Sequence, residues 1–385
     1  MSKKVKYISS FSIKTLHAMV NRTMLQMLCR AFPAEVVCYA SKSALPHLDT
    51  SECINVKKLY VNADNGKLAV LLRYFLSTIH NIRILLTSKK GDILFYNYNN
   101  IFSLSLIDFI NRFKKVDIII CCHGEIEFLS LPTKGFQLYK KVMSKLVRAY
   151  FRKDSHSPAK NIHFIVLSDI AIKNLAPYVS KEMIERFRSI DHPIVPVSST
   201  KTDSYDKQPS CCLKLGTVGI LNEHKGSNKY LDLIKIAKRN GINAQFHVIG
   251  HIQCDATPFK EHGVIVPIKP EEPLPETEFF NKVQELDFIL YFYSSDKYKL
   301  TASGALLDAI RFRKPIIALR NEYFQYFFNK FGEVGYLVDS VDEMVNLIAN
   351  SENLRNDFNF ENIEKKLSTD QLQSQFNMII APLAR

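Results

Sequence analysis

The chain alternates short apolar runs with longer stretches in which apolar residues recur every three or four positions. The short runs predict buried strands, and the longer periodic stretches predict helices. The clearest strands are Val116–Cys122 (VDIIICC) in the first half and Phe288–Tyr293 (FILYFY) in the second. Strands that alternate with helices are typical of α/β folds with parallel sheets. Because 385 residues suffice for two domains that each bury a core, two such series predict two α/β domains.

The same pattern predicts the remaining elements. Further strands are expected at Lys6–Ser9, Glu35–Tyr39, Asp92–Tyr96, Ile162–Leu167, Leu213–Val218, Gln245–Ile249, Val264–Ile268 and Ile316–Leu319. Helices are expected at Ile13–Ala31, Lys67–His80, Phe102–Phe113, Phe136–Lys153, Glu276–Leu286, Ala305–Phe312 and Thr369–Ile380. A stretch rich in Pro, Ser and Thr, Asp191–Ser210, predicts a linker. We therefore expect an N-terminal domain over 1–190, a linker over 191–210, a C-terminal domain over 211–368 and a final helix within 369–385.

Composition indicates a globular protein of the cytoplasm. Hydrophobic residues make up 46% of the chain and charged residues 23%. No uninterrupted apolar run approaches the roughly 18 residues of a membrane-spanning helix, and the N-terminus lacks a long signal-peptide core. The eight cysteines include no C-x-x-C pair, so reduced thiols in the core are expected.

The net charge of +13 is unevenly distributed along the chain. Residues 1–200 carry 29 Lys and Arg against 14 Asp and Glu, whereas the remainder carries 22 against 24. A basic first half favours a negatively charged partner for the N-terminal domain, either anionic lipid or nucleic acid.

Part of this charge lies on the predicted helix Phe136–Lys153. Its apolar residues fall at helical spacing, and its basic residues include Lys140, Lys141, Lys145, Arg148 and Arg152. A helix of this composition could lie at a membrane interface, and the helix around Leu68–Leu76, with Arg73 beside it, is a second candidate for such a surface. The helix Phe136–Lys153 could equally pack on the sheet with its lysines in water, so the pattern leaves both interpretations open.

Two stretches of the second half suit an anion. After the FILYFY strand, Thr301, Ser303 and Gly304 lead into a helix, for which Ser303 is a good N-cap. The N–H groups and dipole at a helix N-terminus attract negative charge. The loop after Leu213–Val218 reads ILNEHKGS and offers Lys225 beside Gly226. An Asp-x-Asp pair is absent from the sequence, so a diphosphate site without metal is favoured.

In the first half, the strand VDIIICC ends in His123-Gly124-Glu125. Both ionisable side chains could reach a substrate for proton transfer, although a surface turn without a catalytic role is the alternative. Asn97, Tyr98 and Asn99, at another strand end, are weaker candidates for contacts with an acceptor.

The second half resembles the nucleotide-sugar-binding domain of group 1 glycosyltransferases, which have the two-domain GT-B fold. The resemblance spans about 170 residues and rests on two motifs. Gly219-Ile220-Leu221, three further residues and Lys225-Gly226 keep the spacing of one family loop. Ser303-Gly304, a helix with Asp308, and Lys314-Pro315 before a strand match another. The chain departs from the family at Ile220, where Arg is usual, and at Leu300, where Glu is usual. His224 or Lys229 could supply the cation that is missing at 220.

This resemblance implies two Rossmann-like parallel-sheet domains that face a cleft, with the final helix crossing back to the N-terminal domain. Asp308 would contact the donor ribose, and Glu125 or His123 would be the base of an inverting enzyme. In a retaining enzyme, His123 would instead position the donor sugar. The donor diphosphate would be bound by Lys225, Gly226, Thr301, Ser303 and Gly304.

The resemblance, together with the basic first half of the chain, implies the substrates and the location. The donor would be a nucleotide-diphosphate sugar, with no further cofactor and no metal. The acceptor would be a lipid-linked saccharide of bacterial surface polysaccharide, such as lipopolysaccharide or capsule. The enzyme would then be peripheral on the inner face of the cytoplasmic membrane, on an anionic surface.

Other functions remain open at this point. A sugar-nucleotide epimerase or a phosphorylase could use the same fold, and a basic nucleic-acid-binding protein could explain the charge. The last is disfavoured because the chain has no Trp and no array of base-stacking residues among its basic residues. We therefore expect no nucleic-acid partner.

Overall fold

A computed structural model describes residues 4–64, 66–132, 138–152, 158–195, 212–270, 272, 274–294, 298–355 and 357–383. The chain divides into two compact units. The first comprises Met1–Val195, Lys299–Ala302 and Leu367–Arg385, and the second comprises Pro196–Tyr298 and Ser303–Lys366. Most of the predicted linker, 191–210, lies outside the described residues.

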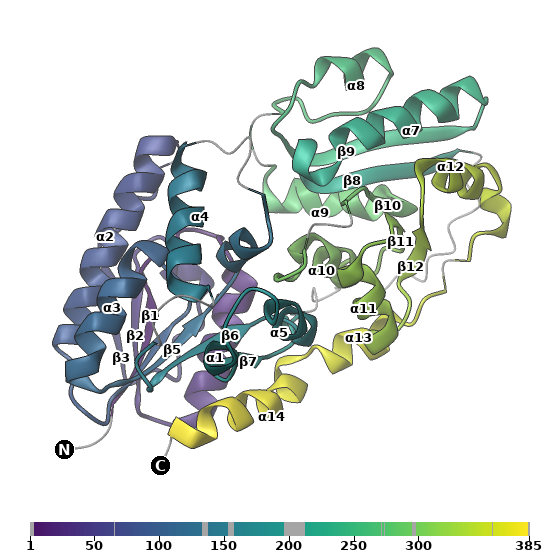
Figure 1. The fold of residues 1–385 in the computed structure, drawn as a ribbon. Helices are drawn as coiled ribbons and strands as arrows, with labels where there is room; N and C mark the ends of the chain where they lie inside the picture. The colour runs from purple at the N-terminus through teal and green to yellow at the C-terminus, as the bar shows by residue number, and fades with distance from the viewer. Residues whose placement is uncertain are drawn as a thin grey trace. The chain divides into compact units, whose positions relative to one another are not determined.

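The first unit is built on a seven-stranded parallel sheet in the order β3-β2-β1-β4-β5-β6-β7 (Figure 1). Alternate residues of β1 enter opposite cores, because Tyr7 lies in one hydrophobic cluster and Ile8 in the other. The strands are β1 (Val5–Ser9), β2 (Val36–Ser41), β3 (Asn55–Leu59), β4 (Ile93–Tyr96), β5 (Asp117–Cys121), β6 (Ile162–Val166) and β7 (Phe187–Ser189).

Helices cover both faces of this sheet. The core on one face includes residues of α2 (Lys67–Leu86), α3 (Ile101–Lys114), α4 (Leu138–Phe151), α5 (Asp169–Leu175) and α6 (Lys181–Ile184). The core on the other face includes residues of α1 (Ala18–Ala31) and of the final helix, α14 (Thr369–Ile380). Parallel sheets covered on both faces are typical of doubly wound α/β folds.

The second unit contains a five-stranded parallel sheet in the order β12-β11-β10-β8-β9. Its strands are β8 (Leu213–Leu221), β9 (Ala244–Ile252), β10 (Phe288–Tyr291), β11 (Ile316–Leu319) and β12 (Gly335–Val338). Its helices are α7 (Ser227–Arg239), α8 (Thr257–Glu261), α9 (Glu276–Glu285), α10 (Gly304–Arg311), α11 (Glu322–Phe331), α12 (Val341–Ala349) and α13 (Phe360–Lys366). Side chains of α7, α8 and α12 share one hydrophobic core with the sheet.

The predicted α/β class with two parallel sheets is confirmed, with three differences in the strands. The predicted strand Val264–Ile268 is wrong, because only Ile265 makes a bridge, to His247. Pro267 in this run lacks the N–H that a longer ladder needs. Two strands at the sheet edges, β3 and β7, were not predicted, because β3 is mostly exposed and β7 has only three residues.

Helix α2 is longer than the predicted Lys67–His80, since it continues to Leu86. With 20 residues, it is the one helix among the described residues that is long and apolar enough to cross a membrane by length and composition. Such a result for a single helix is weak evidence, because core helices of soluble proteins can pass the same test.

Candidate active site

In each sheet the order of the strands runs to one side of the first strand and later reverses to its other side. Ligands of α/β folds bind at this switch point. In the first unit this point lies between β1 and β4, and in the second it lies between β8 and β10. Ser9 and Asn97 lie at the carboxyl ends of β1 and β4, and the side-chain amide of Asn97 donates to Ser9 Oγ at 3.1 Å. The sequence candidates His123 and Lys225 lie at these two edges, as the following contacts show.

His123 follows the carboxyl end of β5 and is buried. Its Nε2 lies 2.8 Å from the backbone carbonyl oxygen of Asn97. A carbonyl oxygen can only accept, so Nε2 carries the proton and the neutral ring keeps Nδ1 as an acceptor. Burial, with a smaller contribution from His17, holds the pKa of His123 well below its usual value. His123 is therefore a neutral imidazole at neutral pH.

Glu125 begins the short 3-10 helix η2 (Glu125–Leu129) and is also buried. Its Oε2 accepts the backbone N–H of His123 at 2.9 Å. Its Oε1 is buried without a hydrogen-bond partner among the described residues. Burial raises the pKa of Glu125 to about 7, against smaller opposing contributions from hydrogen bonds. A carboxyl group with this pKa can exchange a proton at neutral pH.

The sequence did not predict that two aromatic side chains lie beside His123. The His17 ring centre lies 4.3 Å from that of His123, and the Tyr98 ring stacks on His123 at 5.8 Å. His17 has a left-handed backbone conformation (φ 54°) just before α1. The sequence carries no signal for this role of His17, because its unusual feature, the positive φ, becomes visible only in the structure.

Lys225 ends the 3-10 turn η3 (Glu223–Lys225) that follows β8. The side chain of Asn222 fixes this turn by accepting the Lys225 N–H at 3.1 Å. The half-buried ammonium lies 5.8 Å from the ring centre of Tyr293, which comes after β10. The β8 and β10 edges therefore meet at this cation. Burial lowers the pKa of Lys225, whereas the charge of Asp308 acts in the opposite direction.

Gly226 is required by the local backbone. Its φ of +81° lies in the left-handed region, and a Cβ added there would sit 2.4 Å from the carbonyl oxygen of Phe292. The loop that carries Lys225 thus packs directly on the backbone that follows β10. A larger residue at 226 would push the ammonium away from this strand.

Helix α10 begins as the sequence predicts. Ser303 is its N-cap, and its buried Oγ accepts the Leu306 N–H at 3.4 Å. Gly304 is exposed, and a Cβ added to it would meet nothing within 4 Å. Asp308, one turn further on, is half-buried, and burial raises its pKa to about 6 against the charges of Arg311 and Lys225. The second unit therefore brings Lys225, Asp308 and the N-terminus of α10 together.

Thr301 belongs to the segment Lys299–Ala302, which is part of the first unit. Glu127 holds this segment: its carboxylate accepts the N–H groups of Lys299 at 3.0 Å and Leu300 at 2.9 Å. The Thr301 hydroxyl donates to the same carboxylate at 3.3 Å. Leu300, which replaces the family's usual Glu, is buried in a core of the first unit. Sequence reasoning missed Glu127, because its partners lie more than 170 positions away.

The predicted membrane residues lie on or just after α4. Lys141, Lys145 and Arg152 are exposed, and Lys140 is half-buried. Arg148 is engaged by the protein, because its guanidinium donates to the carbonyl oxygens of Phe128, at 3.0 Å, and Leu131.

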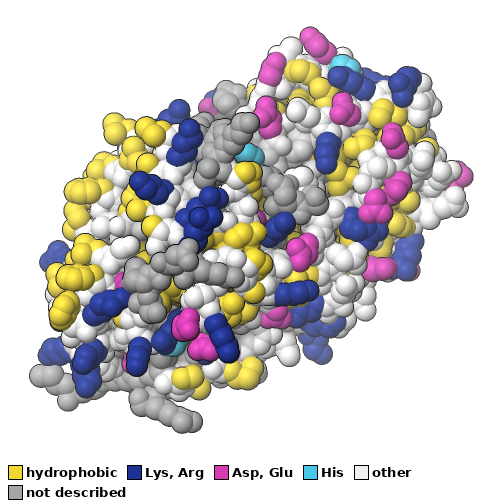
Figure 2. Space-filling model, in the orientation of Figure 1, with side chains coloured by type: hydrophobic (Ala, Val, Ile, Leu, Met, Phe, Trp, Pro, Cys, Tyr) yellow, Lys and Arg dark blue, Asp and Glu magenta, His cyan; other side chains and the backbone are white. Residues whose placement is uncertain are grey.

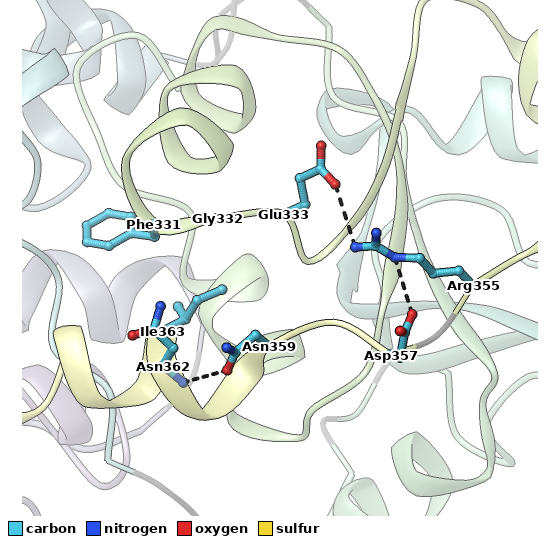
Figure 3. Close-up of a pocket in the computed structure, with 8 residues that line it drawn as sticks. All are labelled: Phe331, Gly332, Glu333, Arg355, Asp357, Asn359, Asn362 and Ile363. Carbon is cyan, nitrogen blue, oxygen red and sulfur yellow. Dashed lines mark hydrogen bonds and ion pairs between the residues drawn. The ribbon is translucent and has the colours of Figure 1, made fainter.

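A separate pocket of about 260 Å³ lies in the second unit and contains none of the predicted site residues (Figure 3). In it, the Arg355 guanidinium reaches between two carboxylates, at 3.7 Å from Glu333 and 3.3 Å from Asp357. We assign it no role. Among the described residues, His, Cys, Asp and Glu form no group of three or more that could hold a metal ion.

Two parallel-sheet units, each with a polar switch point, define the class of this fold, which is that of the GT-B glycosyltransferases. HepE from Anabaena, solved with UDP and glucose, is similar with a TM-score of 0.63 and 11% identity, covering 99% of this chain and 100% of HepE. WaaG, a glycosyltransferase involved in lipopolysaccharide biosynthesis, is similar with a TM-score of 0.54 and 13% identity, covering 98% and 99%.

The N-terminal domain of trehalose-6-phosphate phosphatase from Candida albicans is also similar, with a TM-score of 0.56 and 10% identity, covering 100% of this chain and 98% of that domain. Neither a protein-family model nor a curated protein sequence matches the chain. At these identities the likeness establishes the fold, and the chemistry has to be argued from the site.

Proposed function

We propose that this protein is a glycosyltransferase that transfers a sugar from a nucleotide-diphosphate sugar to a saccharide acceptor. The observation that carries the proposal is the half-buried Lys225 at the β8–β10 switch point, electrostatically coupled to Asp308 on α10. Burial makes the charged form of a lysine less favourable, so an anionic ligand beside it stabilises the charge. HepE, which shares the fold over the whole chain, was solved with UDP and with UDP-glucose, so a UDP-sugar is the first donor to test.

In this proposal the second unit stabilises the departing diphosphate. Negative charge grows on the diphosphate as the bond to the sugar breaks, and a preorganised cation lowers the barrier most when water is excluded. Lys225 supplies that charge, and the exposed N-terminus of α10 at Gly304 supplies N–H groups and a favourable dipole. Ser303 acts through the helix by capping it, and Asp308 accepts hydrogen bonds from the ribose hydroxyls. No metal enters these steps.

The first unit supplies the acid–base group. Glu125, whose pKa is raised to about 7, is better matched to proton transfer at neutral pH than His123, whose pKa is held well below its usual value. In an inverting reaction, Glu125 takes the proton of the acceptor hydroxyl as that oxygen attacks the sugar. His123 keeps the turn in place through its Nε2–H bond to the Asn97 carbonyl.

The acceptor in this proposal is a lipid-linked saccharide at the inner face of the cytoplasmic membrane. Two observations support this location: the basic first half of the chain and the exposed lysines of α4. WaaG, with the same fold, takes part in lipopolysaccharide biosynthesis. Replacing Lys140, Lys141 and Lys145 by Glu should weaken binding to anionic vesicles, whereas binding as tight as that of the wild type would leave α4 as a solvated domain helix.

The first test is thermal unfolding with nucleoside mono- and diphosphates and nucleotide sugars, each with and without EDTA. A ligand that binds only the folded state raises the melting temperature. We expect a shift with one diphosphate that persists in EDTA and is lost in Lys225→Ala but kept in Lys235→Ala, an exposed lysine further along α7. A shift that Lys225→Ala retains, or no shift with any nucleotide, would contradict the proposed donor site. Product analysis with an added saccharide then separates transfer from epimerisation.

A further inference from the structure

Helix α2 presents a largely apolar surface to solvent, while its buried side combines polar residues with Tyr74, Ile84 and Leu85. Its exposed residues Leu68, Leu71, Leu72, Phe75, Ile79 and Leu86 recur at helical spacing and form one stripe. Phe75 is 62% exposed and Leu68 is 80% exposed. An ordinary surface helix of a soluble protein turns its polar and charged residues to solvent instead.

The buried side of α2 is bound to the rest of the first unit by hydrogen bonds. Arg73 donates to the carbonyl oxygens of Asn62 and Asp64, at 3.0 and 2.8 Å. Ser77 and Asn81 both bond Ser10, which follows β1, at 2.8 and 2.7 Å. These bonds fix the rotation of the helix, so its apolar stripe stays directed outward. They also tie α2 to the sheet along its length, which suits a helix that lies on a membrane and does not cross it.

The apolar surface continues onto neighbouring helices. Helix α3 packs against both α2 and α4. It exposes Leu106, Phe109 and Phe113, and the two phenyl rings touch edge to face at 5.5 Å. Leu138, Tyr139 and Val142 extend the exposed set onto α4. Figure 2 shows hydrophobic side chains gathered at the edge of the first unit where α2 and α3 lie in Figure 1. Monomeric proteins rarely expose so many large apolar residues together.

The exposed charges on helices α2, α3 and α4 are of one sign. Helices α2, α3 and α4 contain a single acidic residue, Asp108, and it is buried. The exposed or half-buried charged residues of these helices are all basic: Lys67, Arg83, Arg112, Lys114, Lys140, Lys141, Lys145 and Arg148. A second copy of this face would bring like charges together, which disfavours self-association. Apolar residues among basic ones complement a bilayer with anionic headgroups.

We infer that the α2–α3 face is the membrane-docking surface of this protein, with Leu, Phe and Ile side chains entering an anionic bilayer and the lysines of α4 at its border. The main contact with the membrane is then the insertion of apolar side chains from α2 and α3, and the charge of α4 adds electrostatic attraction. The inference takes its partner from the proposed function, which places the acceptor on a membrane. Its observations do not involve the donor site.

The absence of Trp from the chain gives a clean reporter, since one introduced Trp is the only indole. Phe75→Trp and Phe109→Trp place it on the proposed face, and Ile268→Trp places it on a fully exposed site of the second unit. With phosphatidylcholine vesicles containing phosphatidylglycerol and brominated acyl chains, emission from positions 75 and 109 should shift to the blue and be quenched. Emission from position 268 should not change. Vesicle binding without quenching at 75 and 109, or no binding at all, would overturn the inference.

A loss-of-function arm uses Phe75→Ser combined with Phe109→Ser. Phe75 is 62% and Phe109 60% exposed, so the loss of both rings should lower the partition coefficient by roughly 20- to 400-fold. Because both rings are exposed, the melting temperature should be unchanged. High salt should weaken wild-type binding without abolishing it. Self-association of the wild type that the double variant loses, without vesicle binding, would overturn the inference in favour of a dimer. Nucleotide binding measured without vesicles tests the donor site separately.

Discussion

The carboxyl edges of the two sheets each contain a switch point, but the ionisable residues near them have different protonation states. Near the β1–β4 edge, burial lowers the pKa of an imidazole, His123, and raises that of a carboxyl group, Glu125, so both can be neutral near pH 7. At the β8–β10 edge, burial acts on a cation and an acid, Lys225 and Asp308, whose charges stabilise each other. The first arrangement suits proton transfer and the second suits the binding of an anion with polar hydroxyls. One fold thus offers two sites whose roles are set by the residues at the strand ends.

The strongest test of this comparison is Glu125→Gln. If Glu125 is the base, turnover should fall by about 10²–10⁴-fold, while the donor dissociation constant stays unchanged. Wild-type turnover should rise with pH through an apparent pKa near 7, because the base must be ionised. Steady-state kinetics across pH, with Glu35→Gln as an exposed control in the same unit, measures both. A variant turnover within about threefold of the wild type would move the acid–base role to another group.

The same substitution should stabilise the fold at alkaline pH. The carboxyl group of Glu125 has a pKa of about 7 in the folded protein and 4.5 when the chain is unfolded. The folded state therefore holds the proton more tightly than the unfolded state. Stability is therefore undiminished below pH 4.5 and is lost as pH rises through 7, by up to about 3 kcal/mol. Urea unfolding of Glu125→Gln and wild type should agree at pH 4 and diverge at pH 8. Equal stability at both values would mean that Glu125 is not desolvated.

At the opposite edge, Lys225→Ala should raise the dissociation constant of the nucleoside diphosphate by about 10–100-fold, as expected for a lost charge-assisted hydrogen bond of about 1.5–3 kcal/mol. Titration calorimetry at two salt concentrations should also show a weaker salt dependence in the variant. Lys235→Ala, at an exposed lysine further along α7, is the matched control. Equal losses in the two variants would indicate a general effect of surface charge instead of a specific contact.

The smallest effect is expected for Asp308→Asn. A carboxylate that accepts from ribose hydroxyls should contribute about 1 kcal/mol, which corresponds to roughly a fivefold weaker affinity. The sharper readout is the 2′-deoxynucleoside diphosphate, which should bind more weakly than its ribose counterpart to the wild type but about equally to the variant. Asp232→Asn, an exposed acid on α7, should behave as the wild type. If Asp308→Asn still binds the deoxy ligand more weakly than the ribose ligand, Asp308 does not contact the ribose and acts only as the partner of Lys225.

The sequence predicted the buried, central parts of the fold well. β11 has the predicted bounds, and α10 is displaced by one residue, because apolar strands and a Ser-Gly helix start are local signals. The edge strand β3 was missed because its exposed residues, NVKKL, carry no buried pattern. The sequence marked the helix around Leu68–Leu76 as a second candidate for a membrane interface, but periodicity does not show which side of a helix the protein covers.

For the site, the sequence by itself determined which residue types stand at the strand ends: His123 and Glu125 in one half, Lys225 and Gly226 in the other. Only the tertiary structure decided how they are used. Burial, which depends on the whole chain, shifts the pKa values of Glu125 and Asp308. Long-range packing also places the Lys299–Ala302 segment on Glu127 of the first unit, although these residues stand in the second half of the chain. Local sequence fixes capping and spacing, whereas desolvation and distant hydrogen bonds exist only once the chain has folded.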